Sequence, residues 1–278
     1  MFSSTNPQGE QESRVAIVTG GSSGIGRGAA NELARQGASV VVHGLALDEA
    51  HLVVQEIRIA GGRAIATSGP IDDPETALAA VDLALSEYGQ LDVLVTSAGI
   101  QRYGTAIDTP IETWDEVFNV NVKGVFLACK AALPELRKSA AGSIAIIASV
   151  QASATQANVA AYTSSKGALL SLARAMAVDE GPYGVRVNSI SPGTIDTPML
   201  RNTARLLSDG SSAGMQALVD DWGSAHALGR TGTIQELGAV ISFVTSPRAS
   251  FMTGDDIRVD GGLLARLAAA APKGDKSR

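Results

Sequence analysis

The stretch VAIVTGGSSGIG occupies residues 15–26, and it decides the fold. Residues 15–18 are apolar and predict a short buried strand, while residues 27–36 continue with apolar positions at helical spacing. The order is therefore strand, glycine-rich turn, helix. Glycines let backbone N–H groups approach a pyrophosphate, and a helix N-terminus adds a favourable dipole. The turn predicts a dinucleotide site; the alternative is a turn that only lets the helix pack tightly on its strand.

Apolar runs of strand length alternate with helical patterns through the rest of the chain. The expected strands are 16–19, 39–43, 63–67, 92–96, 143–149, 186–191 and 257–260, and the expected helices are 24–36, 48–60, 74–88, 110–138, 159–180 and 234–246. Strands joined by crossover helices predict an α/β fold: a single-domain, Rossmann-like, doubly wound parallel seven-stranded sheet with helices on both faces. Ligands of such sheets bind beyond the carboxyl ends of the strands.

The catalytic domain is expected to cover residues 13–264. Residues 1–12 are polar and predict a disordered lead-in, and residues 265–278 predict a C-terminal tail. Residues 194–226 are rich in glycine and serine, which predicts a mobile substrate-loop insertion; the alternative is plain surface variation.

Composition narrows the classes of partner. The chain has 278 residues and a net charge of −6 without a long basic run, so we expect no nucleic-acid partner. No apolar stretch approaches the roughly 20 residues of a membrane span, so we expect no membrane association. Cys129 is the only cysteine, which excludes an internal disulfide and favours a cytoplasmic location. Its apolar helical surroundings predict a buried hydrophobe rather than a reactive nucleophile.

A spaced trio of polar residues predicts the chemistry. Tyr162 and Lys166 lie four residues apart, on one face of an expected helix, and Ser149 ends the preceding strand. A lysine close to a phenol is expected to lower the tyrosine pKa, and the serine hydroxyl can hold a carbonyl or alcohol oxygen against it. Tyr162 is then a general base in alcohol oxidation and a general acid in carbonyl reduction. The alternative is a tyrosine and a lysine that merely share a helix face.

Further motifs extend this pattern along the chain. In order they are the glycine turn at 20–26, Ser97-Ala98-Gly99, Asn119-Val120-Asn121-Val122-Lys123-Gly124, Ser149, Tyr162-Thr163-Ser164-Ser165-Lys166, Arg186-Val187-Asn188, Pro192-Gly193 and Asp260-Gly261-Gly262. Over about residues 12–265 the chain resembles the classical short-chain dehydrogenase/reductase family. The resemblance implies an NAD(P)-dependent oxidoreductase that interconverts a secondary alcohol and a ketone by hydride transfer. A sugar, a polyol or a 3-oxoacyl compound is compatible as substrate.

Two other functions stay open on the same fold. One is a non-catalytic dinucleotide-binding sensor, although sensors tend to lose the tyrosine or the lysine that this chain keeps. The other is a dehydratase or isomerase with a tightly held nicotinamide, although such relatives have a different glycine turn and a longer carboxyl domain.

The resemblance also implies which residues form the site. The catalytic residues are Asn121, Ser149, Tyr162 and Lys166, and Asn121 is preferred to Asn119 because it directly precedes Val122-Lys123-Gly124. Lys166 is expected to bind the nicotinamide ribose, and Asn121 to link Lys166 to solvent. The expected cofactor-binding residues are Gly20, Ser22, Ser23, Gly24, Ile25, Gly26, His43, Gly44, Ala98, Gly99, Tyr162, Lys166, Pro192, Gly193 and Thr194. No metal site is expected.

The end of the second strand sets the choice of cofactor. An acidic residue there would accept hydrogen bonds from the ribose 2′-OH and repel a 2′-phosphate, but this chain has Gly44. The sequence therefore favours NADP(H) over NAD(H). Ser22, Ser23, Arg27 and His43 are the polar partners available to the phosphate.

Two segments depart from the family pattern. Thr96-Ser97 stands where the family usually has two asparagines, and Pro70-Ile71 stands where an aspartate and a valine commonly contact the adenine. Thr and Ser make local hydrogen bonds but reach less far than Asn.

The helices expected at 110–138 and 159–180 carry more apolar surface than one buried face needs. Family members that resemble this chain pair these helices between subunits. We therefore expect a homotetramer, with a dimer as the fallback, that acts on a small-molecule alcohol or ketone.

Overall fold

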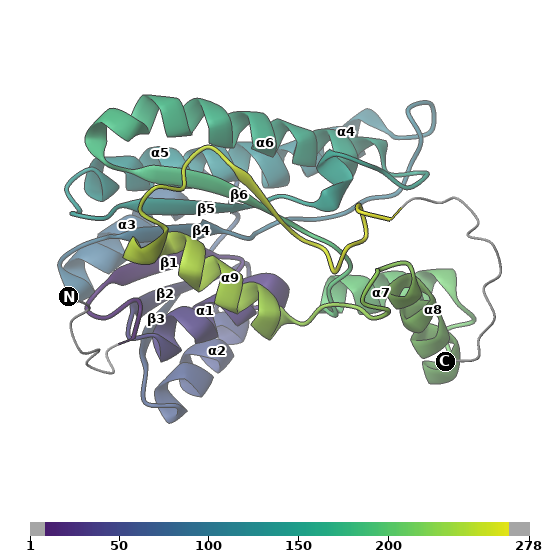
Figure 1. Cartoon of the computed structure of the whole chain (residues 1–278), viewed down its shortest axis with the longest axis horizontal. Helices are drawn as coiled ribbons and strands as arrows, with labels where there is room; N and C mark the ends of the chain where they lie inside the picture. The colour runs from purple at the N-terminus through teal and green to yellow at the C-terminus, as the bar shows by residue number, and fades with distance from the viewer. Residues whose placement is uncertain (1–8, 267–278) are drawn as a thin grey trace.

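The computed structural model describes residues 9–266 (Figure 1). Its strands form one parallel sheet in the order β3-β2-β1-β4-β5-β6-β7. They are β1 (Val15–Thr19), β2 (Ser39–Gly44), β3 (Arg63–Ser68), β4 (Val93–Thr96), β5 (Ser143–Ile147), β6 (Arg186–Pro192) and β7 (Asp256–Val259). The strand order reverses between β1 and β4, so the crevice for a ligand lies at the carboxyl ends of these two strands. The predicted fold class is confirmed.

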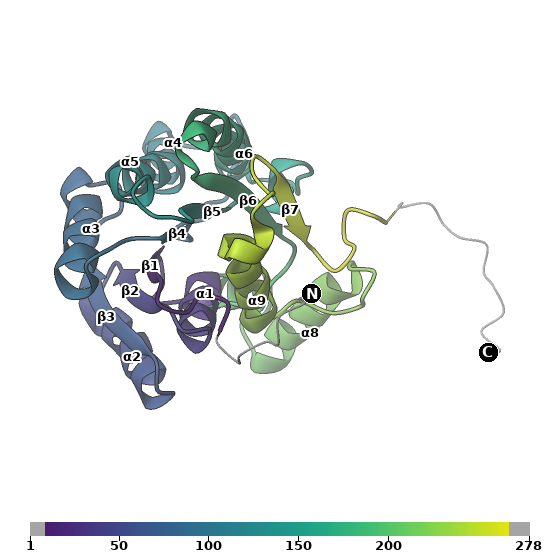
Figure 2. The same cartoon turned by 60° about the vertical axis from the view of Figure 1, so that its left-hand side comes forward.

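Helices cover both faces of this sheet. On one face lie α1 (Gly24–Arg35), α2 (Leu47–Ile59) and α9 (Ile234–Thr245), and on the other lie α3 (Pro74–Tyr88), α5 (Gly124–Leu136) and α6 (Ala160–Glu180). Figure 2 shows α3 beside α5, on the side of the sheet away from α9. The short helix α4 (Ile111–Phe118) leads into α5, while α7 (Pro198–Leu207) and α8 (Ser212–Ser224) follow β6 and stand beyond its carboxyl end (Figure 1).

Each central strand contributes to two hydrophobic cores. Val40 and Val42 of β2 pack into the core beneath α1, α2 and α9, whereas Val41 packs into the core beneath α3, α5 and α6. This alternation follows from the two-residue period of a strand. It also fixes the side on which the last residues of each strand point, and these residues border the site.

The helix predicted at 110–138 is broken in the structure. α4 ends at Phe118, a π-helical turn spans Asn119–Lys123, and α5 starts at Gly124. A π turn inserts one extra residue into a helix and is frequent at functional sites. Here it contains Asn121, a predicted catalytic residue.

The segment 194–226 is mostly helical, which differs from the predicted mobile loop. Thr197 caps α7 by accepting the N–H of Leu200, and Ser211 caps α8 by accepting the N–H of Gly214. Gly210, with a φ of +77°, makes the turn between the two helices. Serine and glycine here are therefore helix caps and a turn, a capping pattern that composition alone does not distinguish from flexibility.

The predicted disordered lead-in also differs where the structure describes it. Gln11 is completely buried and donates hydrogen bonds to the carbonyl of Ser242 and the hydroxyl of Thr245 on α9. These two hydrogen bonds satisfy the buried amide of Gln11. They hold the segment of residues 9–12 against the domain. Residues 1–8 of the lead-in and 267–278 of the tail lie outside the described residues.

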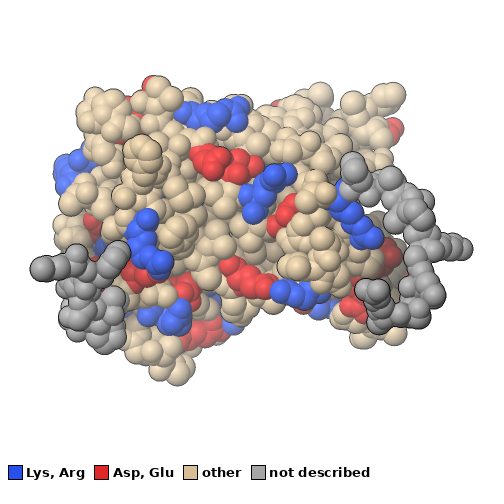
Figure 3. Space-filling model, in the orientation of Figure 1, with Lys and Arg blue, Asp and Glu red and all other residues tan. Residues whose placement is uncertain are grey.

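Cys129 is 1 % exposed within the core beneath α5, and burial raises the pKa of its thiol to about 12. The prediction of a buried hydrophobe is confirmed. In residues 9–266, no helix is long and apolar enough to cross a membrane. On the face shown in Figure 3, basic and acidic side chains are interspersed among uncharged ones.

Candidate active site

Ser149 lies at the carboxyl edge of the sheet, two residues beyond β5. Its backbone is extended, with a φ of −170°, and it caps a short 3-10 turn at Val150–Ala152. The hydroxyl oxygen accepts the N–H of Gln151 at 3.1 Å. Ser149 therefore caps a turn, and this cap holds its hydroxyl in place. A hydroxyl that accepts one bond can still donate its proton to a substrate oxygen.

Tyr162 and Lys166 lie one turn apart near the start of α6, and both are buried. The Lys166 Nζ donates to the carbonyl of Ile147, at the end of β5, at 2.9 Å. It lies 5.6 Å from the centre of the Tyr162 ring. The end of β5 and the first turns of α6 thus bring Ser149, Tyr162 and Lys166 together as predicted.

Asn121 connects this group to the loop after β4. Its side chain is fully buried, accepts the N–H of Ile100 at 2.8 Å, and donates to the Ile100 carbonyl at 2.9 Å and to the Ser165 hydroxyl at 3.0 Å. Ser165 in turn donates to the carbonyl of Tyr162 at 2.7 Å. Asn121 thus holds the β4 loop and α6 in register. Its family role of linking Lys166 to solvent stays a prediction.

Ser165 is a positioning residue that the sequence reasoning did not single out. It stands inside the quoted Tyr162–Lys166 motif, directly before the lysine. Its position three residues after Tyr162 is the signal that places its hydroxyl near the Tyr162 carbonyl.

Burial changes the pKa of both titratable groups at this site. It raises the pKa of Tyr162 to about 12, an effect that contact with the Ser149 hydroxyl partly offsets. It lowers the pKa of Lys166 to about 8. The expected lowering of the Tyr162 pKa by Lys166 is not seen in the protein alone. The lysine ammonium is bonded to the Ile147 carbonyl instead of the phenol, and desolvation of the phenolate dominates.

The glycine turn between β1 and α1 has the shape of a cradle for a dinucleotide. A Cβ at Gly26 would overlap the carbonyl oxygen of Gly20, and a Cβ at Gly20 would lie 2.7 Å from the backbone nitrogen of Ala98. Gly20 and Gly24 have positive φ angles. The Ser23 side chain does not cap α1, and the first N–H groups of a helix have no acceptor within it. These residues fit the pyrophosphate of a dinucleotide.

The loops that follow β4 and β6 lie next to this cradle. A Cβ at Gly99 would lie 3.4 Å from Asn121 Oδ1 and 3.6 Å from Lys166 Nζ, so the open side of Gly99 faces the catalytic group. After β6, Thr197 lies 3.5 Å from where a Gly24 Cβ would stand. The turn Pro192–Thr194 therefore leads into a segment that borders the cradle.

Comparison with known proteins shows which family has this arrangement of a glycine turn and catalytic residues. A family model described as Enoyl-(Acyl carrier protein) reductase matches residues 20–264. Cyclopentanol dehydrogenase of Comamonas testosteroni is 37% identical, over 92% of this chain and 99% of its own length. Cyclohexanol dehydrogenase of Acinetobacter sp. (strain SE19) is 35% identical, over 89% and 94%.

A solved structure is also similar. The ligand-free aldohexose dehydrogenase of Thermoplasma acidophilum superposes with a TM-score of 0.86 at 33% identity, over 95% of this chain and 99% of that one. The chain belongs to the short-chain dehydrogenase/reductase family. The predicted NAD(P)-dependent oxidoreductase acting on CH–OH groups is thereby confirmed.

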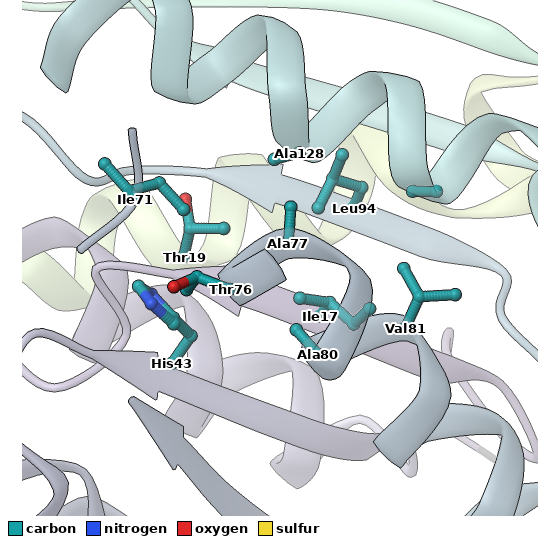
Figure 4. A pocket seen from close by; sticks show the side chains of 11 residues that line it. Ile17, Thr19, His43, Ile71, Thr76, Ala77, Ala80, Val81, Leu94 and Ala128 are labelled. Carbon is teal, nitrogen blue, oxygen red and sulfur yellow. The ribbon is translucent and has the colours of Figure 1, made fainter. Parts of the chain in front are cut away.

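Gly44 and His43 have different surroundings in this short-chain dehydrogenase/reductase. A Cβ at Gly44 would lie 2.7 Å from the Ser22 hydroxyl oxygen, so Gly44 borders the glycine turn. The His43 ring faces the opposite side of the sheet, where it lines a small apolar cavity with Thr19, Ile71 and Thr76 (Figure 4).

His43 therefore contributes to the turn through its backbone. Its carbonyl accepts the N–H of Gly21 at 2.7 Å, while its ring Nε2 lies 3.1 Å from the carbonyl of Gly69. Burial lowers the pKa of the ring, which disfavours the cation. The structure does not bring the predicted phosphate partner His43 to the turn, because adjacent residues of a strand point to opposite faces. Arg27, also expected near the phosphate, forms a bidentate ion pair with Glu56 on α2.

Further polar side chains lie on the segments next to the catalytic group. Gln151 follows Ser149, and its buried Oε1 has no hydrogen-bond partner among the described residues. Tyr103, from the loop after β4, donates to Thr203 on α7 at 3.3 Å and accepts from Gln101 at 3.3 Å. These contacts connect the loop after β4 to α7.

Proposed function

We propose that the enzyme oxidises a secondary alcohol to a ketone, and reverses the reaction, with NADP(H) as the preferred cofactor. The observation that carries this proposal is the buried Tyr162–Lys166 pair on α6, placed against Ser149 and beside a glycine cradle. A bound nicotinamide dinucleotide supplies the hydride acceptor or donor. The rest of the chemistry is proton transfer, and this chain has the groups for it.

Each catalytic side chain has a distinct part. Ser149 donates a hydrogen bond to the substrate oxygen and holds it near the phenol. As the phenolate, Tyr162 takes the hydroxyl proton during oxidation, and as the phenol it returns that proton during reduction. Lys166, held by the Ile147 carbonyl, presents an ammonium beside the phenol and toward the expected position of the nicotinamide ribose. Burial excludes water, so these charges act at close range in a low dielectric.

We propose an alicyclic secondary alcohol as the substrate. This proposal is supported by the names of the curated relatives, which act on cyclopentanol and cyclohexanol. A sugar is the second candidate, because the unpartnered Gln151 Oε1 can accept a substrate hydroxyl and because the similar solved structure is an aldohexose dehydrogenase.

A substrate panel separates these candidates. Cyclopentanol, cyclohexanol, a hexose, a polyol and a 3-hydroxyacyl thioester are each supplied with NADP⁺ and NAD⁺, and reduced nicotinamide is followed by absorbance. We expect the largest kcat/KM with a cyclic alcohol. Replacing Gln151 by Met keeps the side-chain length but removes the amide, and for a hydroxyl-rich substrate we expect a loss of roughly 10-fold or more. An equal effect of Gln151→Met on both classes would exclude an amide contact with a sugar hydroxyl.

The preference for NADP(H) rests on charge at the end of β2. Gly44 carries no carboxylate that would repel a 2′-phosphate, and the Ser22 hydroxyl beside it can donate a hydrogen bond.

We also propose a homotetramer, with a dimer as the fallback. Its support is the exposed apolar surface on the helices of one face: Ile111 of α4 is 70% exposed, and Val178 of α6 is 77% exposed. Light scattering during size exclusion measures the assembly at micromolar concentration. A monomer would contradict the proposal, and a stable dimer would leave only the fallback. A cytoplasmic location, inferred from the single cysteine, stays a prediction.

A further inference from the structure

His226 is a buried histidine outside the catalytic group, between α8 and α9. It is 3% exposed, and both of its ring nitrogens have backbone partners. Its Nε2 lies 3.1 Å from the backbone nitrogen of Thr194, in the turn after β6. Its Nδ1 lies 3.1 Å from the carbonyl oxygen of Trp222, near the end of α8.

These two contacts fix the tautomer of the ring. A backbone N–H can only donate, so Nε2 must accept the hydrogen bond from Thr194. The ring proton is then on Nδ1, where it donates to the Trp222 carbonyl. The neutral ring thus forms a bridge between the turn after β6 and the helix α8.

The same turn is held from two other sides. The carbonyl of Thr194 accepts the N–H of Gly232 at 2.9 Å, and the N–H of Gly193 donates to Val259 of β7 at 3.0 Å. A Cβ at Gly193 would lie 2.9 Å from His226 Nε2, so histidine and glycine are in close contact. Both backbone polar groups of Thr194 are therefore engaged by the segment that joins α8 to α9.

We propose that His226 is a positioning residue for the nicotinamide end of the cofactor. It orients the turn Gly193–Thr194 and ties that turn to α8. This inference rests on the proposed dinucleotide site. The adenosine end would be held near Gly44 of β2, across the β1–β4 switch point from the turn after β6, and is not expected to depend on His226.

Two substitutions distinguish the contribution of the Nε2 contact from that of the Nδ1 contact. In His226→Gln the Oε1 of glutamine can take the position of Nε2 and still accept from Thr194. In His226→Asn the Nδ2 of asparagine can take the position of Nδ1 and still donate to Trp222, but the Thr194 N–H loses its acceptor. The pair is matched because each variant is neutral and keeps one of the two contacts.

The measurement is dinucleotide binding by calorimetry, with melting temperature as a check on folding. Two pairs of compounds are compared: NADP⁺ with 2′-phospho-ADP-ribose, and NAD⁺ with ADP-ribose. In each pair the first compound is the dinucleotide, and the second, called here the ribose compound, lacks the nicotinamide ring. For His226→Asn we expect the Kd of the dinucleotide to rise roughly 10-fold while that of the ribose compound changes less than about twofold, because the Thr194 N–H has lost the acceptor that fixes the turn. For His226→Gln we expect both Kd values within about threefold of wild type.

Equal losses for the dinucleotide and the ribose compound, or equal losses in the two variants, would overturn the proposal. Should His226→Asn fail to fold, His226→Gln decides alone, because the proposal requires it to fold and to bind dinucleotide nearly as wild type does. Wild-type protein that binds neither dinucleotide would refute the proposed function as well. Wild-type binding that His226→Asn leaves unchanged would refute only the role of His226.

Discussion

The two ends of the cofactor crevice differ in how directly the sequence specifies them. At the catalytic end, Ser149, Tyr162 and Lys166 meet through a strand end and one turn of helix, and the structure places all three as expected. At the end of β2, Gly44 borders the glycine turn but its neighbour His43 faces the other side of the sheet. The comparison teaches that helical spacing brings functional groups together, whereas a strand separates adjacent residues by turning each to a different face.

The first prediction removes the proton-transferring group from the catalytic end. Tyr162→Phe keeps the ring and should keep the fold, but turnover should fall at least ~100-fold, because general acid–base catalysis contributes about that much. Tyr88→Phe, on α3 and away from the site, is the matched control and should retain turnover. Near-wild-type turnover of Tyr162→Phe with a good substrate would remove Tyr162 from its role.

The second prediction concerns the energetic consequence of burying Lys166. Its folded pKa of about 8 lies below the ordinary value, so between these two pH values the unfolded chain binds more protons than the folded one. The unfavourable contribution of Lys166 to folding is thus complete below pH ~8 and disappears as pH rises toward ~10.5.

We therefore compare Lys166→Met with wild type by denaturant unfolding at several pH values. Relative to the variant, wild type should gain up to about 3 kcal/mol of unfolding free energy as pH rises through this window. Lys130→Met, an exposed lysine on α5, is the control and should show no such trend. A gap that stays constant with pH would mean that burial of Lys166 does not perturb its titration.

The third prediction tests the β2 end through charge alone. Gly44→Asp and Gly44→Asn both introduce a Cβ that must displace the Ser22 side chain. Only the aspartate adds a negative charge that faces a 2′-phosphate. The ratio of kcat/KM for NADP⁺ over NAD⁺ should therefore be roughly 10-fold lower in Gly44→Asp than in Gly44→Asn. Equal ratios in the two variants would show that Gly44 is not at the phosphate.

The fourth prediction is the smallest effect. His43→Gln keeps a donor for the Gly69 carbonyl and leaves the backbone contact with Gly21 in place. Because the ring points away from the turn, the NADP⁺/NAD⁺ preference should change less than about twofold. A clear shift of that ratio would restore His43 as a ligand of the phosphate.

Most of the fold was predictable because its signals are periodic. The strands, the crossover helices and the glycine turn each have a local pattern of apolar residues and glycines, and the structure confirms the sheet that they imply. The break in the helix at 110–138 was not predictable from apolar spacing, since the π turn at Asn119–Lys123 shifts the helix by one residue without changing its composition. The helices α7 and α8 were not predictable from composition, because a segment rich in glycine and serine has the same composition whether Ser211 caps a helix and Gly210 makes a turn or both lie in a mobile loop.

In the active site, too, the residues that follow a local sequence pattern were predictable and the properties that depend on distant segments were not. The catalytic residues could be named from spacing because Tyr162 and Lys166 share a helix that also supplies Ser165. The pKa of Tyr162 could not, since it depends on burial by segments far apart in the sequence. The role of His226 could not be predicted for a similar reason: it lies 32 residues from Thr194, whose backbone N–H it accepts.

The central claim is that the catalytic end moves a hydride from a carbinol carbon while Tyr162 takes the hydroxyl proton. The most direct measurement supplies wild-type enzyme with NADP⁺ and cyclopentanol deuterated at its carbinol carbon, then determines the mass of the reduced dinucleotide. The account predicts that the reduced dinucleotide carries the deuterium and that Tyr162→Phe forms almost none of it. Reduced dinucleotide without the label would contradict direct hydride transfer, and no reduction with any alcohol of the panel would favour a sensor that binds the dinucleotide without turning it over.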